Sequence, residues 1–146
     1  MKKSHVAAVA LALLLTGCAA HFGDPKAYRD FGVRTGNVAY ASVQVVADQY
    51  IVVSQEPIFV KQDTDNTIYW SLPPGGAYYF LPTTTPNPGI VFDNPQMPRT
   101  ECDLYNGDKW TYVCTYKRAN RAKYPYTIRV TNGTDIVKSD PTVMND

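Results

Sequence analysis

The sequence predicts an all-β protein, with an antiparallel β-sandwich as the expected architecture and a small β-barrel as the alternative. Three observations lead to this expectation. No window of about eleven or more residues holds a helical period of apolar residues. The 11 prolines are scattered through the segments where helices would have to run. Short stretches rich in β-branched and aromatic residues recur at roughly ten-residue spacing, with turn formers between them.

The stretches expected to be strands share a high content of valine, isoleucine, threonine and tyrosine. They are Val38 to Val46, Tyr50 to Ser54, Ile58 to Lys61, Thr67 to Leu72, Tyr78 to Leu81, Ile90 to Phe92, Thr111 to Tyr116, Tyr126 to Thr131 and Thr134 to Lys138. Between the last two stands Asn132-Gly133, a strong signal for a β-hairpin. The polar run from Asp63 to Asn66 predicts a further turn.

The N-terminal segment has the features of an export signal. Two lysines precede an apolar run, His5 to Leu15, that is too short for a membrane-spanning helix of about 20 residues. Leu15-Thr16-Gly17-Cys18 follows at once and resembles the lipobox of bacterial lipoproteins. The resemblance implies cleavage before Cys18, acylation of this cysteine and, because Ala19 follows it, anchoring in the outer membrane of a Gram-negative host. An ordinary secretory peptide cut nearby is the alternative.

These features divide the chain into residues 1–17 as signal peptide, 18–36 as lipidated N-terminus and tether, and 37–146 as one domain. Removal of Lys2 and Lys3 with the signal lowers the 14 basic residues to 12 against 13 acidic ones. The formal net charge then changes from +1 to −1. Such a balance provides no basic field for nucleic acid, so we expect the membrane contact to come from the lipid and the domain to face the periplasm.

The two remaining cysteines, Cys102 and Cys114, form an even pair in a chain expected to reach an oxidising compartment. A hairpin that places them opposite each other would have a loop around Asn106 to Lys109, whereas a two-residue Asn106-Gly107 turn would pair Cys102 with Thr111. The longer loop therefore suits a disulfide better. Closing this loop would contribute roughly 3 kcal/mol of stability, and two free thiols are the alternative.

The last ninety or so residues carry a second resemblance. The order TIYWSL, YYF, GIVF, two cysteines around a turn, YPYTIRV and a terminal DPTVMND is similar to a small immunoglobulin-like β-domain of secreted bacterial proteins. The resemblance implies an immunoglobulin-like sandwich and carries no function with it.

Catalytic and metal chemistry find little support in the sequence. His21 is the one histidine of the mature chain and lies three residues from Cys18, too close to the expected anchor to serve a domain serine. Asp63 and Asp65 are spaced like the start of a calcium loop, but Ile68 stands where the EF-hand needs glycine. We therefore expect no enzyme, no cofactor and no metal, with a carboxylate-only hydrolase as the third choice of function.

Aromatic and basic residues provide the candidate binding surface. One of Tyr69 and Trp70 should face inward and the other outward, and the same holds for Tyr78 and Tyr79. We expect Trp70 in the core. The candidate surface residues are Tyr69, Tyr78, Tyr79, Lys117, Arg118, Arg121 and Lys123. The function expected is a lipid-anchored envelope protein that contacts another envelope protein; the alternative is a periplasmic inhibitor or a glycan-binding module.

Overall fold

The computed structural model describes residues 37–61, 64–92, 94, 100–117 and 122–145. Within these ranges the chain forms strands and no helix. The strands are β1 (Val38–Val46), β2 (Tyr50–Val53), β3 (Ile58–Val60), β4 (Asn66–Ser71), β5 (Ile90–Val91), β6 (Thr100–Tyr105), β7 (Asp108–Tyr116), β8 (Lys123–Pro125), β9 (Thr127–Thr131), β10 (Ile136–Ser139) and β11 (Thr142–Asn145). The predicted all-β class is confirmed.

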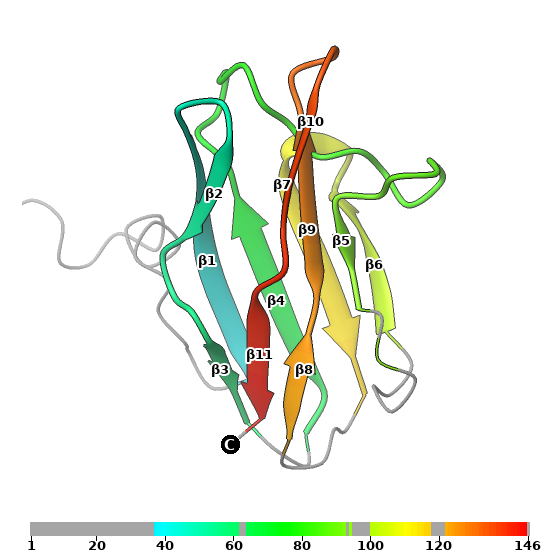
Figure 1. Ribbon diagram of the computed structural model, residues 1–146. Coiled ribbons are helices and arrows are strands. Elements are labelled where there is room, and N and C mark those ends of the chain that lie inside the picture. The colour runs from blue at the N-terminus through cyan, green and yellow to red at the C-terminus, as the bar shows by residue number, and fades with distance from the viewer. Residues whose placement is uncertain (1–36, 62–63, 93, 95–99, 118–121, 146) are drawn as a thin grey trace, which may run out of the picture.

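The strands form three sheets (Figure 1). The largest has five strands in the order β2-β1-β4-β7-β6, and its β1–β4 pair is parallel while the other pairs are antiparallel. The two smaller sheets have the orders β10-β9-β5 and β3-β11-β8. The parallel pair brings together two strands that are separated in sequence by β2 and β3.

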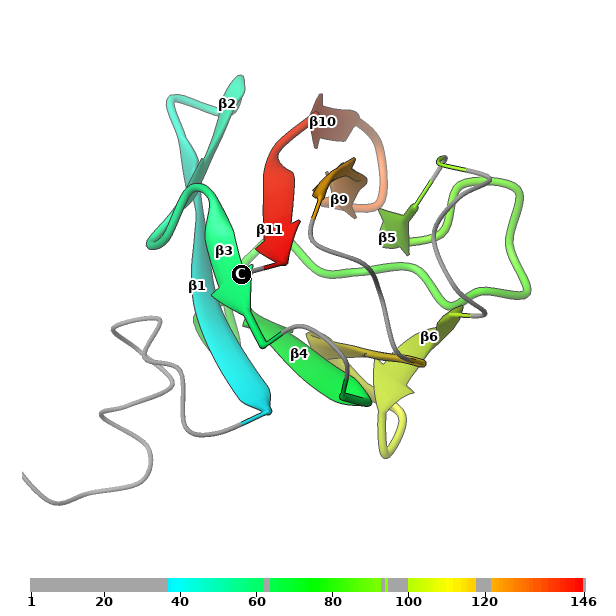
Figure 2. The ribbon, with the colours of Figure 1, turned by 90° about the horizontal axis from the view of Figure 1, so that it is seen from below.

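The two smaller sheets lie on one side of the five-stranded sheet (Figure 2), and they follow each other end to end along the strand direction (Figure 1). β8 continues into β9 through Tyr126, and β10 continues into β11 through Asp140 and Pro141. The Tyr126 N–H donates to the Pro141 carbonyl at 3.0 Å and so connects the two halves across this break. The resulting arrangement of layers is consistent with a β-sandwich. All strand pairing between described residues stays within the three sheets, so no barrel closes among them.

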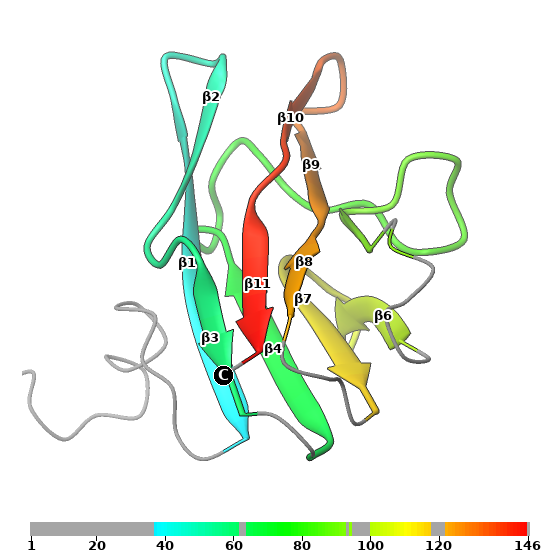
Figure 3. The ribbon, with the colours of Figure 1, turned by 60° about the horizontal axis from the view of Figure 1, so that its bottom comes forward.

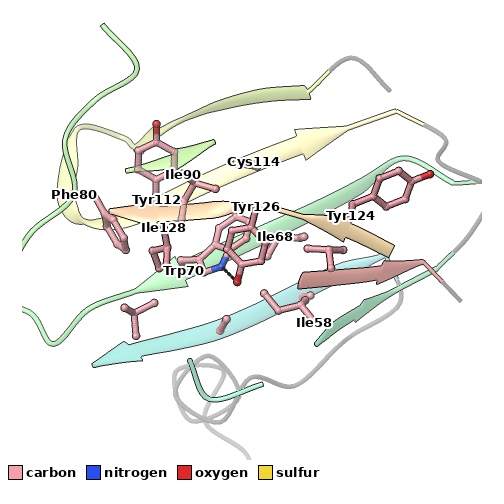
Figure 4. Close-up of a cluster of buried hydrophobic side chains, with 14 of the residues drawn as sticks. Ile58, Ile68, Trp70, Phe80, Ile90, Tyr112, Cys114, Tyr124, Tyr126 and Ile128 are labelled. Atoms are coloured by element: carbon pink, nitrogen blue, oxygen red, sulfur yellow. Dashed lines mark hydrogen bonds between the residues drawn. The ribbon is translucent and has the colours of Figure 1, made fainter. Parts of the chain in front are cut away.

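Aromatic side chains fill the space between the layers (Figure 4). Trp70 of β4 is fully buried, as expected, and its Nε1–H donates to the Tyr126 hydroxyl at 3.0 Å. The two rings lie 5.3 Å apart, and Phe92 packs against both. Burial raises the pKa of the Tyr126 phenol far above its ordinary range, so this hydroxyl remains a neutral acceptor for the indole.

Most predicted strands are confirmed within a few residues at their ends, but the expectation of a strand from Tyr78 to Leu81 is wrong. Tyr79 makes only an isolated bridge with Thr131 of β9. The next residue, Phe80, donates its N–H to the Lys109 carbonyl of β7 at 2.8 Å. Neighbouring residues thus bond to opposite layers, and the segment crosses between sheets rather than continuing either one. β6, β8 and β11 were not among the predicted strands.

The β6–β7 hairpin carries a disulfide. Cys102 and Cys114 are directly opposite each other, with their Cα atoms 4.1 Å apart, and are bonded. Tyr105 nevertheless pairs with Asp108, so the turn contains only Asn106-Gly107, whose φ angles of 51° and 75° suit a type I′ turn. The expectation of a longer loop is therefore wrong, although the pairing of the cysteines is as expected.

A β-bulge reconciles the short turn with the disulfide. The register of the β6–β7 pair shifts near the turn, so β7 holds residues that have no partner on β6. Two of them, Lys109 and Trp110, turn their carbonyls to the Phe80 and Leu72 N–H groups, each at 2.8 Å. The bulge thereby attaches the long connection after β4 to the five-stranded sheet.

The two other predicted turns are present in modified form. β9 and β10 pair through Thr131 and Ile136, so the hairpin at Asn132-Gly133 has a four-residue loop rather than a two-residue turn. Between β3 and β4, the buried Asn66 side chain donates to the Lys61 carbonyl at 2.7 Å and to the Thr64 carbonyl at 2.9 Å. These amide hydrogen bonds give Asn66 a structural role in this turn, and Asp63 lies outside the described residues.

Candidate binding face

The five-stranded sheet has one face against the core and one face toward solvent. In β1, Ala39, Ala41 and Val43 are buried, and the residues between them point the other way. The same alternation holds in β4, where Ile68 and Trp70 are buried. We call the solvent side of this sheet the outer face. Its side chains come from alternate residues of β2, β1, β4, β7 and β6.

Three tyrosines contact one another on the outer face. Tyr40 of β1 and Tyr69 of β4 are partners in the parallel register, and their rings stack with centroids 5.2 Å apart at 17°. The Tyr105 ring of β6 meets Tyr69 edge to face at 5.4 Å and 83°. Such contacts each add roughly 0.5–1.5 kcal/mol beyond burial, so the three rings form a preorganised row. Tyr69 is outward and Trp70 inward, as the alternation required.

The β1–β2 hairpin extends the outer face with apolar side chains. Val46, Tyr50 and Val52 are 46%, 63% and 50% exposed. Val46 is the direct partner of Tyr50, and Val52 is the partner of Gln44, so all four point to the same side. β2 lies beside β10 of the other layer (Figure 3). Four of the six large apolar side chains that the described residues expose, Val46, Tyr50, Val52 and Tyr105, therefore lie on the outer face.

The charged residues of this face lie at its margins. The outward residues of β1, β2 and β4 are Val38, Tyr40, Ser42, Gln44, Val46, Tyr50, Val52, Thr67, Tyr69 and Ser71, all uncharged. Glu101 and Asp103 occupy the outward positions of the edge strand β6. Lys117 follows β7 and forms an ion pair with Asp65 at 2.7 Å. An uncharged, tyrosine-containing centre with charges at the margin is the composition of a protein interface.

Tyr78 and Tyr79 lie apart from the row of tyrosines, at the end of the molecule near the β1–β2 turn. Tyr78 packs against the core, and its hydroxyl donates to the Asp48 Oδ1 at 3.1 Å. Burial, together with this carboxylate, raises the pKa of Tyr78. Tyr79 points the other way, and the Lys109 ammonium lies 4.4 Å from its ring centroid. The two residues do face different surroundings, but both are half-buried.

The predicted basic cluster is only partly described. Lys117 is engaged by Asp65, and Lys123 is exposed at the start of β8, on the opposite layer from Tyr69. Arg118 and Arg121 lie outside the described residues. Of the predicted surface residues that the structure describes, Tyr69 is a member of the tyrosine row.

Other expectations fall on the N-terminal segment. Cys18, the lipobox, His21 and the tether all lie in residues 1–36, outside the described residues. In the part of the chain that is described, no helix is both long and apolar enough to cross a bilayer. The same part holds no group of three or more metal-ligating side chains.

The sequence reasoning missed Tyr40, Tyr105 and the exposed hairpin. Tyr40 could have been assigned an outward position, because small apolar residues flank it on both sides. Its contact with Tyr69 depends on a parallel pairing of distant strands, which no local pattern encodes. No protein-family model matches the chain, and a search of curated proteins finds no match either.

Proposed function

We propose that this chain is a lipid-anchored, non-enzymatic binding protein of the bacterial cell envelope, with an immunoglobulin-like β-sandwich domain that contacts another envelope protein. The lipid anchor at Cys18 and its outer-membrane location rest on the lipobox sequence. The binding role rests on one structural observation, the uncharged outer face of β2, β1 and β4 with its stacked tyrosines.

A protein partner suits this face for two physical reasons. Tyrosine supplies a large contact area and a hydrogen-bonding tip at a low cost in side-chain entropy, and the Tyr40–Tyr69–Tyr105 row is already ordered in the free protein. Val46, Tyr50 and Val52 expose apolar surface whose removal from water contributes roughly 25 cal/mol per Å². A soluble domain without a partner gains nothing from concentrating such side chains on one hairpin.

Cross-linking in intact cells tests the binding role. We expect a defined cross-linked protein with the wild-type chain and its loss in the variants Tyr50→Lys and Val52→Lys, because a buried unpaired charge opposes docking. Phe59→Lys is the matched control, since Phe59 is a 37% exposed apolar residue on β3 in the other layer. Equal loss in all three variants, or loss in none, would refute docking on the outer face.

A separate experiment tests the anchor. Cys18→Ala should abolish acylation and leave an unprocessed or soluble precursor, as seen by intact mass and membrane fractionation. An unchanged mass of the mature product and equal membrane partitioning of the variant would contradict the lipoprotein assignment.

A further inference from the structure

A groove of about 320 Å³ opens on the outer face where β1 and β4 separate. The parallel β1–β4 ladder ends at the pair Ser42 and Ser71. Beyond it, β1 continues alongside β2, while the Leu72 N–H turns to the Trp110 carbonyl at 2.8 Å. Pro73 follows, and because proline has no N–H it cannot extend the ladder. The groove is therefore built by the fold and does not depend on a mobile side chain.

The lining of the groove is neutral and of two kinds. Ser42, Gln44 and Ser71 contribute two hydroxyls and an amide, and Pro73 and Pro74 contribute flat apolar rings. Val43 and Leu72 have buried side chains, so they line the groove through their backbone. Since the Ser42 N–H and C=O both bond Ser54 on the β2 side, the alternation along β1 directs the Val43 N–H and C=O toward β4, where the N–H belongs to the last pairing of the parallel ladder and the C=O lies beyond it.

This chemistry discriminates among ligand classes. An anion would find no cationic side chain among the lining residues, and a cation would find no carboxylate. A hydrocarbon would lie against the Gln44 amide and the Ser71 hydroxyl without replacing the hydrogen bonds that these groups can make with water. A sugar ring has hydroxyls that both donate and accept, and C–H faces that pack against proline or tyrosine rings. The stacked Tyr40 and Tyr69 lie one outward position along each strand from Ser42 and Ser71.

We infer that this groove, lined by Ser42, Gln44, Ser71, Pro73 and Pro74, is a binding site for a neutral saccharide. The inference does not depend on the proposed protein partner. The volume of the groove lies at the lower end of the range of small-molecule sites, which suits one or two sugar rings of a longer chain. The Gln44 amide and the Ser71 hydroxyl bind ring hydroxyls, and the prolines cover a C–H face.

Titration of the isotope-labelled, purified full chain with two neutral probes tests the site. The probes are the β-1,4-linked tetramer of N-acetylglucosamine and the α-1,4-linked tetramer of glucose. We expect at least one of them to shift the Gln44 side-chain amide and the Val43 backbone amide in a saturable way. Gln44→Ala should weaken binding about two- to tenfold, the equivalent of one hydrogen bond. Ser71→Val should weaken it more than tenfold, because it removes a hydroxyl and adds a methyl group inside the groove.

Thr115→Val is the matched control, since Thr115 lies on the outward side of β7 away from the groove. It should bind the probe as the wild type does. The inference is overturned if neither saccharide gives a saturable shift, if Thr115→Val loses as much affinity as Gln44→Ala, or if a neutral Gly-Ser-Thr-Gly peptide shifts the same signals at lower concentration. Because the titration contains no partner protein, its failure leaves the cross-linking result untouched, and the reverse also holds.

Discussion

Two hairpins bound the five-stranded sheet at its opposite edges, and they are stabilised in different ways. The β6–β7 hairpin has a disulfide, an Asn106-Gly107 turn and a bulge that attaches a distant loop. The β1–β2 hairpin has none of these features among the described residues. Its turn is closed by the Gln49 N–H and the Val46 carbonyl at 3.2 Å and places Ala47 and Asp48 at φ angles of 52° and 55°.

Their outward surfaces differ in the same sense. β6 presents Glu101 and Asp103, charges of the kind that discourage further strand pairing at a sheet edge. β2 presents Tyr50 and Val52, which are both largely exposed and apolar. The hairpin with strong internal stabilisation is thus polar, and the hairpin that relies on contacts with β10 and Tyr78 exposes the apolar surface. The edge with the disulfide and the edge that exposes apolar side chains thus lie on opposite sides of one sheet.

Among the tests of this comparison, reduction of the disulfide should change the stability of the protein most. Loss of the Cys102–Cys114 bond should lower the free energy of unfolding by roughly 3 kcal/mol and the melting temperature by about ten degrees or more. The control is Val52→Thr in the other hairpin, for which we expect a change within about 0.5 kcal/mol. Thermal melts with and without reductant measure both. If both cysteines alkylate readily in the folded, non-reduced protein, the assignment of stability to this hairpin fails.

The second prediction concerns Tyr78, which supports the β1–β2 turn through Asp48. Tyr78→Ala should cost about 2 kcal/mol, less than the 3–5 kcal/mol of a fully buried aromatic, because the ring is half-buried. Tyr79→Ala should cost about 1 kcal/mol, since this ring loses mainly its contact with the Lys109 ammonium. Chemical denaturation distinguishes the two. Equal costs would show that the hydroxyl contact and the core packing of Tyr78 do not support the turn.

Local signals in the sequence sufficed for most of the fold. The Asn132-Gly133 hairpin, the strand from Val38 to Val46 and the inward position of Trp70 all follow from turn chemistry and the period of two. The segment from Tyr78 to Leu81 did not, because its hydrogen bonds are divided between two layers. β8 and β11 are short, and each contains a single buried tyrosine or valine, which gives no alternation to recognise.

The candidate site was less predictable for a physical reason. Alternation puts Tyr69 and Trp70 on opposite sides of the strand, so the expectation of Trp70 in the core was enough to assign Tyr69 outward. The contacts of Tyr69 with Tyr40 and Tyr105 join strands that are distant in sequence, and the second of them also depends on the bulge in β7. Pairing between distant strands is a property of the whole fold, so the composition of the outer face emerges only with the sheet order.

The third prediction concerns the backbone conformation of the two hairpin turns, each of which has a residue with a positive φ angle. Gly107→Ala should destabilise the protein by about 1 kcal/mol, because φ is +75° there and no atom lies within 4 Å of the added Cβ, so the cost is purely conformational. Ala47→Gly should instead stabilise it by about 0.5 kcal/mol, since glycine relieves the left-handed strain but adds chain entropy. Denaturation midpoints measure both changes. Effects of the same sign would contradict the view that the β1–β2 turn is the strained one.

The smallest effect should appear as a pH dependence of the β6–β7 hairpin. Burial acts to raise the pKa of Asp103, but the Leu104 and Thr83 N–H groups, at 2.8 and 3.2 Å from Oδ1, outweigh it and hold the pKa below its ordinary value of 3.8. A lowered pKa in the folded state means that the charged form stabilises the fold above about pH 3.8, and that this contribution is lost as the pH falls through the lowered pKa. Asp103→Asn removes the charge but keeps an acceptor. The wild type should therefore be more stable than the variant at pH 6, by no more than about 0.5 kcal/mol because the side chain is exposed, and the two should converge near pH 2. Melting curves of both proteins between these pH values measure the difference. A constant difference across the range would show that the carboxylate charge does not contribute to holding the loop after β4 against β6.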